Sequence, residues 1–151
     1  MALSLTVGTN TYISLADAES YVERLYGPMR DAWDALADAT KNALLAQATL
    51  DIDAHLWRGY KSDADQALEF PRDGDATTDS TYTKVEQACV EQALYRLKYN
   101  PEGRQALAAQ GVRNFSIGKH NESIAAGGVA ILAPNAKRLL REWLLIGACL
   151  V

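Results

Sequence analysis

The chain has 151 residues, of which 48% are hydrophobic and 23% are charged, and its net charge is −4. These values describe one globular domain that can bury a real core, and they exclude a disordered chain. The two cysteines lie in apolar runs without a CxxC spacing. We therefore expect no disulfide framework, and we expect the chain to work in a reducing, cytosolic setting.

Charge and targeting signals narrow the class further. Residues 1–83 contain six Lys/Arg and fourteen Asp/Glu, whereas residues 84–151 contain nine and five. This asymmetry fits either scattered surface charge or a molecule with one acidic and one basic part. The N-terminus lacks the basic and apolar regions of a signal peptide, and the longest apolar run, Leu144 to Val151, is too short to span a bilayer.

Hydrophobic periodicity predicts mostly helices. In chain order we expect a strand at 3–8, helices at 14–27, 31–36, 40–56, 83–99 and 102–110, a β-hairpin at 112–125 and a helix from 134. Ser14 with Asp17 and Thr83 with Glu86 are capping-box pairs that mark two of the helix starts. Pro134 suits the first turn of the last helix.

The period changes in the hairpin segment. Arg113, Phe115 and Ile117 alternate with polar residues before a glycine-containing bend. The predicted fold class is therefore mainly α: a single domain over 1–151, built as a bundle of four to five helices with an inserted β-hairpin and a short N-terminal strand.

The stretch LWRGYKSDADQALEFPRDGD, residues 56–75, joins two of the long helices. Its glycines and prolines exclude a regular helix or strand, and its aspartates favour turns. The residues of interest are Trp57, Arg58, Gly59, Phe70, Pro71 and Arg72. We interpret the stretch as an ordered connecting loop, in which Trp57 and Phe70 pack against the helices and the arginines form ion pairs.

No pattern for catalysis or metal binding is present in the sequence. Asp51, Asp53 and His55 fall within one predicted helix, where residues two apart point about 200° away from each other, so they cannot converge on one ion. The run Asp73–Asp75 does not continue into a calcium loop. Nucleophile, phosphate-loop and zinc-protease motifs are absent. We expect no enzyme activity, metal or cofactor.

A single-stranded-DNA-binding module is one alternative. Trp57 and Tyr60 beside Arg58 and Lys61 combine rings that stack on bases with cations that meet phosphates. The carboxylates of the same loop and a pI near 5.1 oppose this interpretation, because both repel a phosphate backbone.

An assembly protein is the other alternative. Residues 134–151 predict a C-terminal helix followed by an apolar tail, which closes as WLLIGACLV. Such a tail either docks on its own domain or inserts into a partner, since exposed apolar patches usually mark interfaces.

The order of these features resembles that of a family of small tailed-bacteriophage proteins. The matching residues are Tyr12, Ser14, Asp17, Ala18 and Trp33; Trp57, Gly59, Lys61, Leu68, Phe70, Pro71, Arg72 and Gly74; Val85, Ala88 and Glu91; and Val112, Ser116, Ile117 and Gly118. The family is that of head-to-tail adaptor (connector) proteins, whose members are also labelled DnaT-like and single-stranded-DNA-binding. One departure is Tyr82–Thr83, where members often carry Ile–Pro.

The resemblance implies a structural virion protein rather than an enzyme. Such subunits are made in the host cytoplasm and assemble at the head–tail junction. There they form a homo-oligomeric ring, typically twelve-membered, beneath the portal. The ring extends the DNA channel used in viral genome packaging, meets a tail or head-closure protein, and lets genomic double-stranded DNA pass without specific binding. No membrane is involved.

The resemblance also implies two contact elements. The portal-docking residues would be Arg141, Trp143, Leu144, Leu145, Ile146, Leu150 and Val151. The residues that contact a neighbouring subunit or the channel would be Arg113, Phe115, Ile117, Lys119 and His120 of the hairpin.

Overall fold

The computed structural model describes residues 3–72, 79–99, 114–117, 120–123 and 132–145. Its elements are α1 (Leu15–Val22), α2 (Pro28–Asp34), α3 (Asp38–Asp53), α4 (Asp79–Tyr99), β1 (Asn114–Ile117), β2 (His120–Ser123) and α6 (Pro134–Leu139). The described part is mainly helical, which confirms the predicted fold class at that level. None of its helices is long and apolar enough to cross a membrane.

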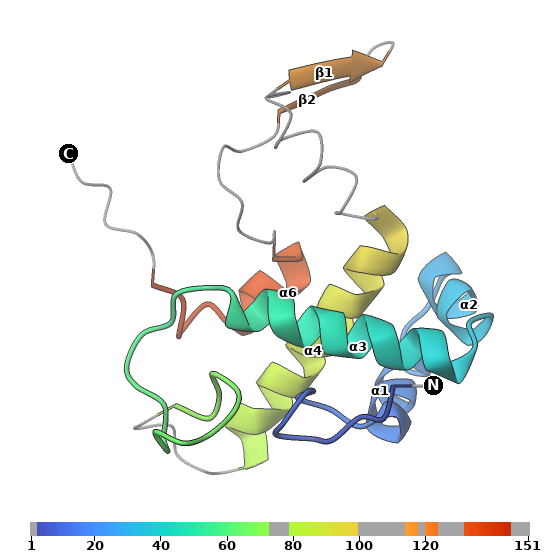
Figure 1. Ribbon diagram of the computed structural model, residues 1–151. Coiled ribbons are helices and arrows are strands. Elements are labelled where there is room, and N and C mark those ends of the chain that lie inside the picture. Colours follow the sequence, from blue (N-terminus) through green and yellow to red (C-terminus); the bar gives the residue numbers. More distant parts are fainter. Residues whose placement is uncertain (1–2, 73–78, 100–113, 118–119, 124–131, 146–151) are drawn as a thin grey trace.

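Helix α4 is the centre of the domain. It contacts α1, α2, α3 and α6, and α3 lies across it in Figure 1. The buried side chains of α4 include the small residues Val85, Ala88 and Cys89 and the larger residues Gln92, Leu94 and Arg96. Other large core residues come from the elements around α4: Trp33, Leu45, Ile52 and Leu140.

A buried ion pair links α3 to α4. Asp51 and Arg96 are both nearly inaccessible, and the guanidinium contacts both carboxylate oxygens. The Gln92 amide donates to Asp51 Oδ2 at 2.8 Å and accepts from the Ala133 backbone N–H at 2.7 Å. One network therefore connects α3, α4 and the residue that precedes α6. Every polar group in it has a partner, as buried polar groups require.

The predicted N-terminal strand is wrong. Residues 3–6 form no strand, and Val7 makes only an isolated bridge to Thr11. The chain turns at Gly8, whose φ of 80° favours glycine, and the Asn10 side chain accepts from Thr6 N and donates to Ser4 O. The alternating segment has no partner strand among the described residues, and the Asn10 side chain forms hydrogen bonds with its backbone instead.

Several helix boundaries also differ from those expected. Helix α3 is Asp38–Asp53 rather than 40–56, and α4 begins at Asp79, so the pair Thr83 and Glu86 does not mark its start. Helix α1 ends at Val22, and the separate helix α2 begins at Pro28 directly after Gly27, whose φ is 114°. Proline at the first helical position, preceded by a residue that tolerates positive φ, explains why α2 starts earlier than 31.

The predicted hairpin at 112–125 stays a prediction. Its strand residues are β1 and β2, which pair antiparallel with Asn114 opposite Ser123 and Ile117 opposite His120. The bend and the residues on both sides lie outside the described residues, as does the helix expected at 102–110.

Candidate functional site

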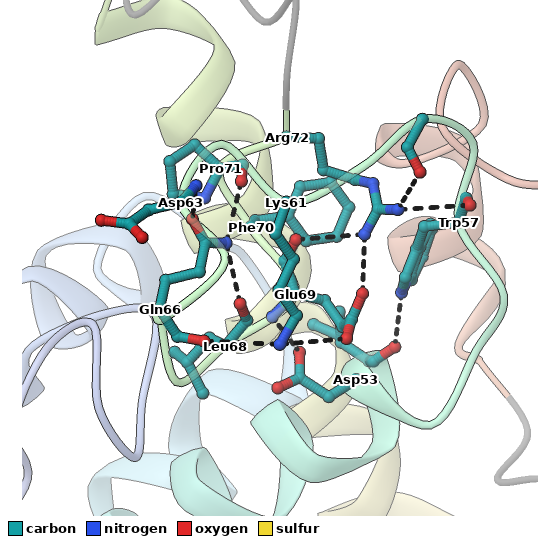
Figure 2. Close-up of polar contacts among 12 residues, drawn as sticks. Asp53, Trp57, Lys61, Asp63, Gln66, Leu68, Glu69, Phe70, Pro71 and Arg72 are labelled. Atoms are coloured by element: carbon teal, nitrogen blue, oxygen red, sulfur yellow. Dashed lines mark hydrogen bonds and ion pairs between the residues drawn. The ribbon is translucent and has the colours of Figure 1, made fainter.

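The loop from Trp57 to Arg72, called the signature loop below, is anchored to the core by part of its side chains. Figure 2 shows the Arg72 guanidinium between Trp57 and Glu69. Trp57 and Phe70 are buried and meet edge to face, with ring centroids 5.0 Å apart. The ring centroids of Phe70 and Trp143 lie 5.5 Å apart, and Trp57 Nε1 donates to Ile52 O at 3.0 Å. The rings of Trp57 and Phe70 are therefore structural.

Arg72 organises the backbone of the same loop. Its guanidinium donates to the carbonyls of Arg58, Gly59 and Glu69, and it forms an ion pair with the Glu69 carboxylate at 2.6 Å (Figure 2). Lys61 Nζ lies 3.4 Å from the other oxygen of Glu69. Both cations are thus engaged within the subunit, which makes them poor candidates for phosphate contacts.

The alternative of a stacking platform in this loop is not supported at Trp57, which has only 5% of its surface exposed. Tyr60 is 81% exposed and Arg58 is exposed, but the ring beside them is closed to a ligand. Trp57 and Phe70 pack on each other and Arg72 forms an ion pair, as expected for an ordered connecting loop.

Asp53 sits beneath the loop and ties it to the N-terminal segment. Its Oδ1 accepts from the Tyr12 hydroxyl and, at 3.4 Å, from the Glu69 N–H. Burial raises the pKa of the Asp53 carboxyl, and this effect exceeds the lowering by the hydrogen bond from Tyr12. Burial and the adjacent Asp53 likewise raise the pKa of Tyr12 well above its ordinary value.

The sequence pattern Asp51, Asp53 and His55 does not form a site. Asp51 faces Arg96, Asp53 faces Tyr12, and His55 Nδ1 contacts the Asp51 carbonyl at 2.8 Å. Within the residues that the structure describes, no group of three or more His, Cys, Asp and Glu side chains could hold a metal ion. Burial raises the pKa of the Cys89 thiol to about 12, so this group is not an activated nucleophile.

The residues expected to dock on a portal lie in different surroundings. Trp143 is buried in the core, Leu144 is half-buried, and Arg141 is exposed. Leu145 is 53% exposed and its N–H donates to the carbonyl of Leu56, which is itself 77% exposed. Leu56 and Leu145 are called the leucine patch below. Ile146, Leu150 and Val151 lie outside the described residues.

The hairpin residues expected to contact a neighbour are placed only in part. Phe115, Ile117 and His120 belong to the paired strands β1 and β2. Arg113 and Lys119 lie outside the described residues.

A second aromatic cluster, which the sequence analysis missed, lines a groove at the C-terminal end of α4. This end lies between α2 and α6 (Figure 1). The groove has a volume of about 400 Å³, and its rings are Tyr26, Tyr95 and Tyr99. Tyr26 is fully exposed, Tyr99 is 40% exposed, and the rings of Tyr95 and Tyr99 lie 4.8 Å apart. We call this feature the tyrosine groove.

One cation, Lys98, lines the tyrosine groove, with Nζ 4.9 Å from the centre of the Tyr99 ring. Arg24 lies over the ring of Tyr21 at 5.5 Å, and the Tyr21 hydroxyl donates to the groove residue Glu91. Burial and the hydrogen bond to Glu91 raise the pKa of Tyr21.

The groove is also lined by a carboxylate and an amide. Glu91 Oε1 accepts from the Tyr21 hydroxyl at 2.7 Å, and Glu91 Oε2 accepts from Asn135 Nδ2 at 2.9 Å. Glu91 and Asn135 both line the groove. The lining thus combines aromatic rings, hydrogen-bond acceptors and the ammonium of Lys98.

Sequence reasoning missed the groove because its rings come from separate elements. Tyr26 lies in the α1–α2 connection, and Tyr95 and Tyr99 lie in α4. The available signal was the i, i+4 spacing of Tyr95 and Tyr99, which places them on one face of a helix. Nothing in the sequence showed that Tyr26 would lie opposite that face.

Comparison with known proteins assigns a family. Residues 4–144 match the family described as "Putative DnaT-like ssDNA binding protein". No curated protein and no solved structure matches the chain. The match extends from the N-terminal turn through α6 and therefore covers nearly all of the chain. The chain belongs to this DnaT-like family.

Proposed function

We propose that the chain is a single-stranded-DNA-binding protein that takes bases in the tyrosine groove. The observation that carries this proposal is the exposure of Tyr26 and Tyr99 around a hollow. Tyr26 is fully exposed and Tyr99 is 40% exposed, so both rings present surface on which a base can stack. The description of the family points to the same ligand.

The chemistry of the groove suits unpaired bases better than a duplex. Each base that stacks on an aromatic side chain contributes about 1–3 kcal/mol, and stacking requires a base that is free of its pair. Lys98 lines the groove and is placed to approach a phosphate between stacked bases.

Overall charge limits the electrostatic part of the binding. The pI is near 5.1, so the protein as a whole repels the DNA backbone. The ammonium of Lys98 offsets this repulsion locally. We expect affinity to come chiefly from stacking, with a weak dependence on salt compared with basic DNA-binding proteins.

Fluorescence anisotropy with a labelled single-stranded oligonucleotide tests the proposal. Replacing Tyr26 by alanine is expected to weaken binding by 1–3 kcal/mol, about 5- to 150-fold. Tyr60→Ala is the matched control, because Tyr60 is also a largely exposed tyrosine but lies in the signature loop. The proposal fails if the wild-type protein does not bind, or if both variants bind as well as the wild type.

A second candidate function is that of a head-to-tail adaptor, which the leucine patch favours. Leu56 and Leu145 are exposed apolar residues whose backbones are joined by a hydrogen bond from the Leu145 N–H to the Leu56 carbonyl. The apolar residues 146–151 continue the chain from this patch. The exposed apolar surface of the leucine patch suits a protein partner such as a portal.

This second proposal assigns the portal, neighbouring copies in a ring and a tail-side protein as partners. The double variant Leu56→Asp/Leu145→Asp should prevent sedimentation with a portal while the domain stays folded. Leu50→Asp is the control, because Leu50 is an exposed leucine of α3 away from the patch. Native mass spectrometry that detects only monomers in the presence of the portal would count against the adaptor.

A further inference from the structure

We infer that the tyrosine groove prefers bases that carry an exocyclic amino group, so that it binds cytosine more tightly than thymine. This inference rests on the proposed function, since it concerns which base the same groove accepts. It follows from the two polar side chains that line the groove, Glu91 and Asn135, rather than from its aromatic rings.

The first of these polar atoms belong to Glu91. A glutamate at neutral pH is a hydrogen-bond acceptor only, with about four lone-pair sites on two oxygens. Tyr21 and Asn135 each supply one donor, one to each oxygen. Each oxygen therefore retains capacity to accept another hydrogen bond. Burial and Glu91 raise the pKa of Tyr21, so its hydroxyl remains protonated and directed at Glu91.

Asn135 adds a second acceptor. Its Nδ2 is engaged with Glu91 Oε2, which leaves the amide oxygen Oδ1 as the atom with unused capacity. The preceding residues add no competing donor. Pro134 has no N–H, and the Ala133 N–H donates to Gln92.

The remaining polar groups of the groove do not reverse this preference. The tyrosine hydroxyls rotate and serve as donors or acceptors, so they do not discriminate between bases. Lys98 is a donor, but its ammonium lies over the Tyr99 ring at the rim, where it can meet a phosphate. The side-chain acceptors with a fixed direction are thus those of Glu91 and Asn135.

Cytosine and thymine provide the cleanest comparison. They are pyrimidines of similar stacking area, but cytosine presents the N4 amino donor where thymine presents the O4 acceptor. A hydrogen bond from N4 to a carboxylate is charge-assisted, whereas O4 in the same place would face that carboxylate with no proton between them. A preference on the order of tenfold is expected.

Competition anisotropy between dC12 and dT12 at pH 8 tests the inference, with the wild-type chain and Glu91→Gln. The wild type should bind dC12 about tenfold more tightly. Glu91→Gln replaces one acceptor oxygen of the groove lining by an amide donor. The preference for dC12 should fall to less than about twofold, and dT12 should bind as tightly as to the wild type or more tightly. Asn135→Ala should lower the preference by a smaller factor, and rC12 against rU12 should follow the same order.

The outcomes separate this inference from the proposed function. Equal affinity for dC12 and dT12, with binding that Tyr26→Ala weakens, overturns the base preference and leaves the proposed function standing. An unchanged preference in Glu91→Gln also overturns it. If circular dichroism shows that Glu91→Gln is unfolded, the relative affinity of the wild type for dC12 and dT12 still tests the base preference. Absence of binding to either oligonucleotide overturns both proposals.

Discussion

The signature loop and the tyrosine groove contain the same kinds of side chain, aromatic rings beside cations, but the structure uses them in opposite ways. In the loop, the rings of Trp57 and Phe70 pack on each other and Arg72 binds backbone carbonyls. In the groove, Tyr26 and Tyr99 face outward. The comparison teaches that aromatic and cationic composition does not identify a ligand site. What identifies one is whether those groups are already satisfied within the fold.

The largest effect is expected from Trp57→Ala in the signature loop. The Trp57 side chain is 5% exposed and packs against Phe70, so its removal leaves a cavity and should cost about 3–5 kcal/mol of unfolding free energy. Urea unfolding followed by circular dichroism measures this change. Tyr60→Ala, in the same loop, should stay within about 0.5 kcal/mol. A similarly small effect for Trp57 would place the loop outside the core and break the comparison.

Arg72→Ala is expected to be the next largest change, about 3 kcal/mol of unfolding free energy. The substitution leaves the carbonyls of the loop and the Glu69 carboxylate without their buried donor. Arg72→Lys should recover only part of the loss, because an ammonium cannot reproduce the planar fork of donors. The same urea experiment applies, with the exposed Arg58→Ala as control. Full recovery by lysine would contradict the assigned role.

Alkaline pH should destabilise the region under the loop. Burial and Asp53 raise the pKa of Tyr12 above its unfolded value near 10. The folded chain therefore retains a proton that the unfolded chain loses, so stability is complete below pH 10 and falls above it. The expected loss is about 1.4 kcal/mol per pH unit. Unfolding curves at several pH values measure the slope, and Tyr12→Phe should reduce it; an unchanged slope would refute this origin.

The smallest effect, and the one that tests the groove directly, is expected from Lys98→Ala. Removing one phosphate contact to a single strand should reduce the slope of log affinity against log salt by about 0.7. Stability should change by less than about 0.5 kcal/mol, because Lys98 is exposed. Lys61→Ala is the control for the loop, where the ammonium pairs with Glu69. Equal salt slopes for the wild type and Lys98→Ala would show that Lys98 does not contact a phosphate.

Local signals predicted much of the fold. Ser14 caps α1 by accepting from Asp17 N, as the capping-box spacing indicated, and Pro134 begins α6. Both features depend on contacts within one turn of helix, which the sequence displays directly. The inward faces of α3 and α4 follow from periodicity in the same way.

The features that the sequence did not predict depend on contacts between distant segments. Residues 3–6 alternate like a strand but have no described partner strand, so an asparagine side chain binds their backbone instead. Trp57 is expected to pack against the helices, but its ring contact with Phe70, and the contact of Phe70 with Trp143, depend on the tertiary fold. The tyrosine groove requires Tyr26 to lie opposite α4, which is a property of the tertiary fold.

The hydrogen bond from the Ala133 N–H to Gln92 has a consequence for how the chain can evolve. It fixes the start of α6 against the middle of α4, so the core determines where the chain departs after Tyr99 and where it returns. A substitution of Gln92 that removes this acceptor leaves the Ala133 N–H unsatisfied in the core. The two positions are therefore constrained together, although they lie far apart in the sequence.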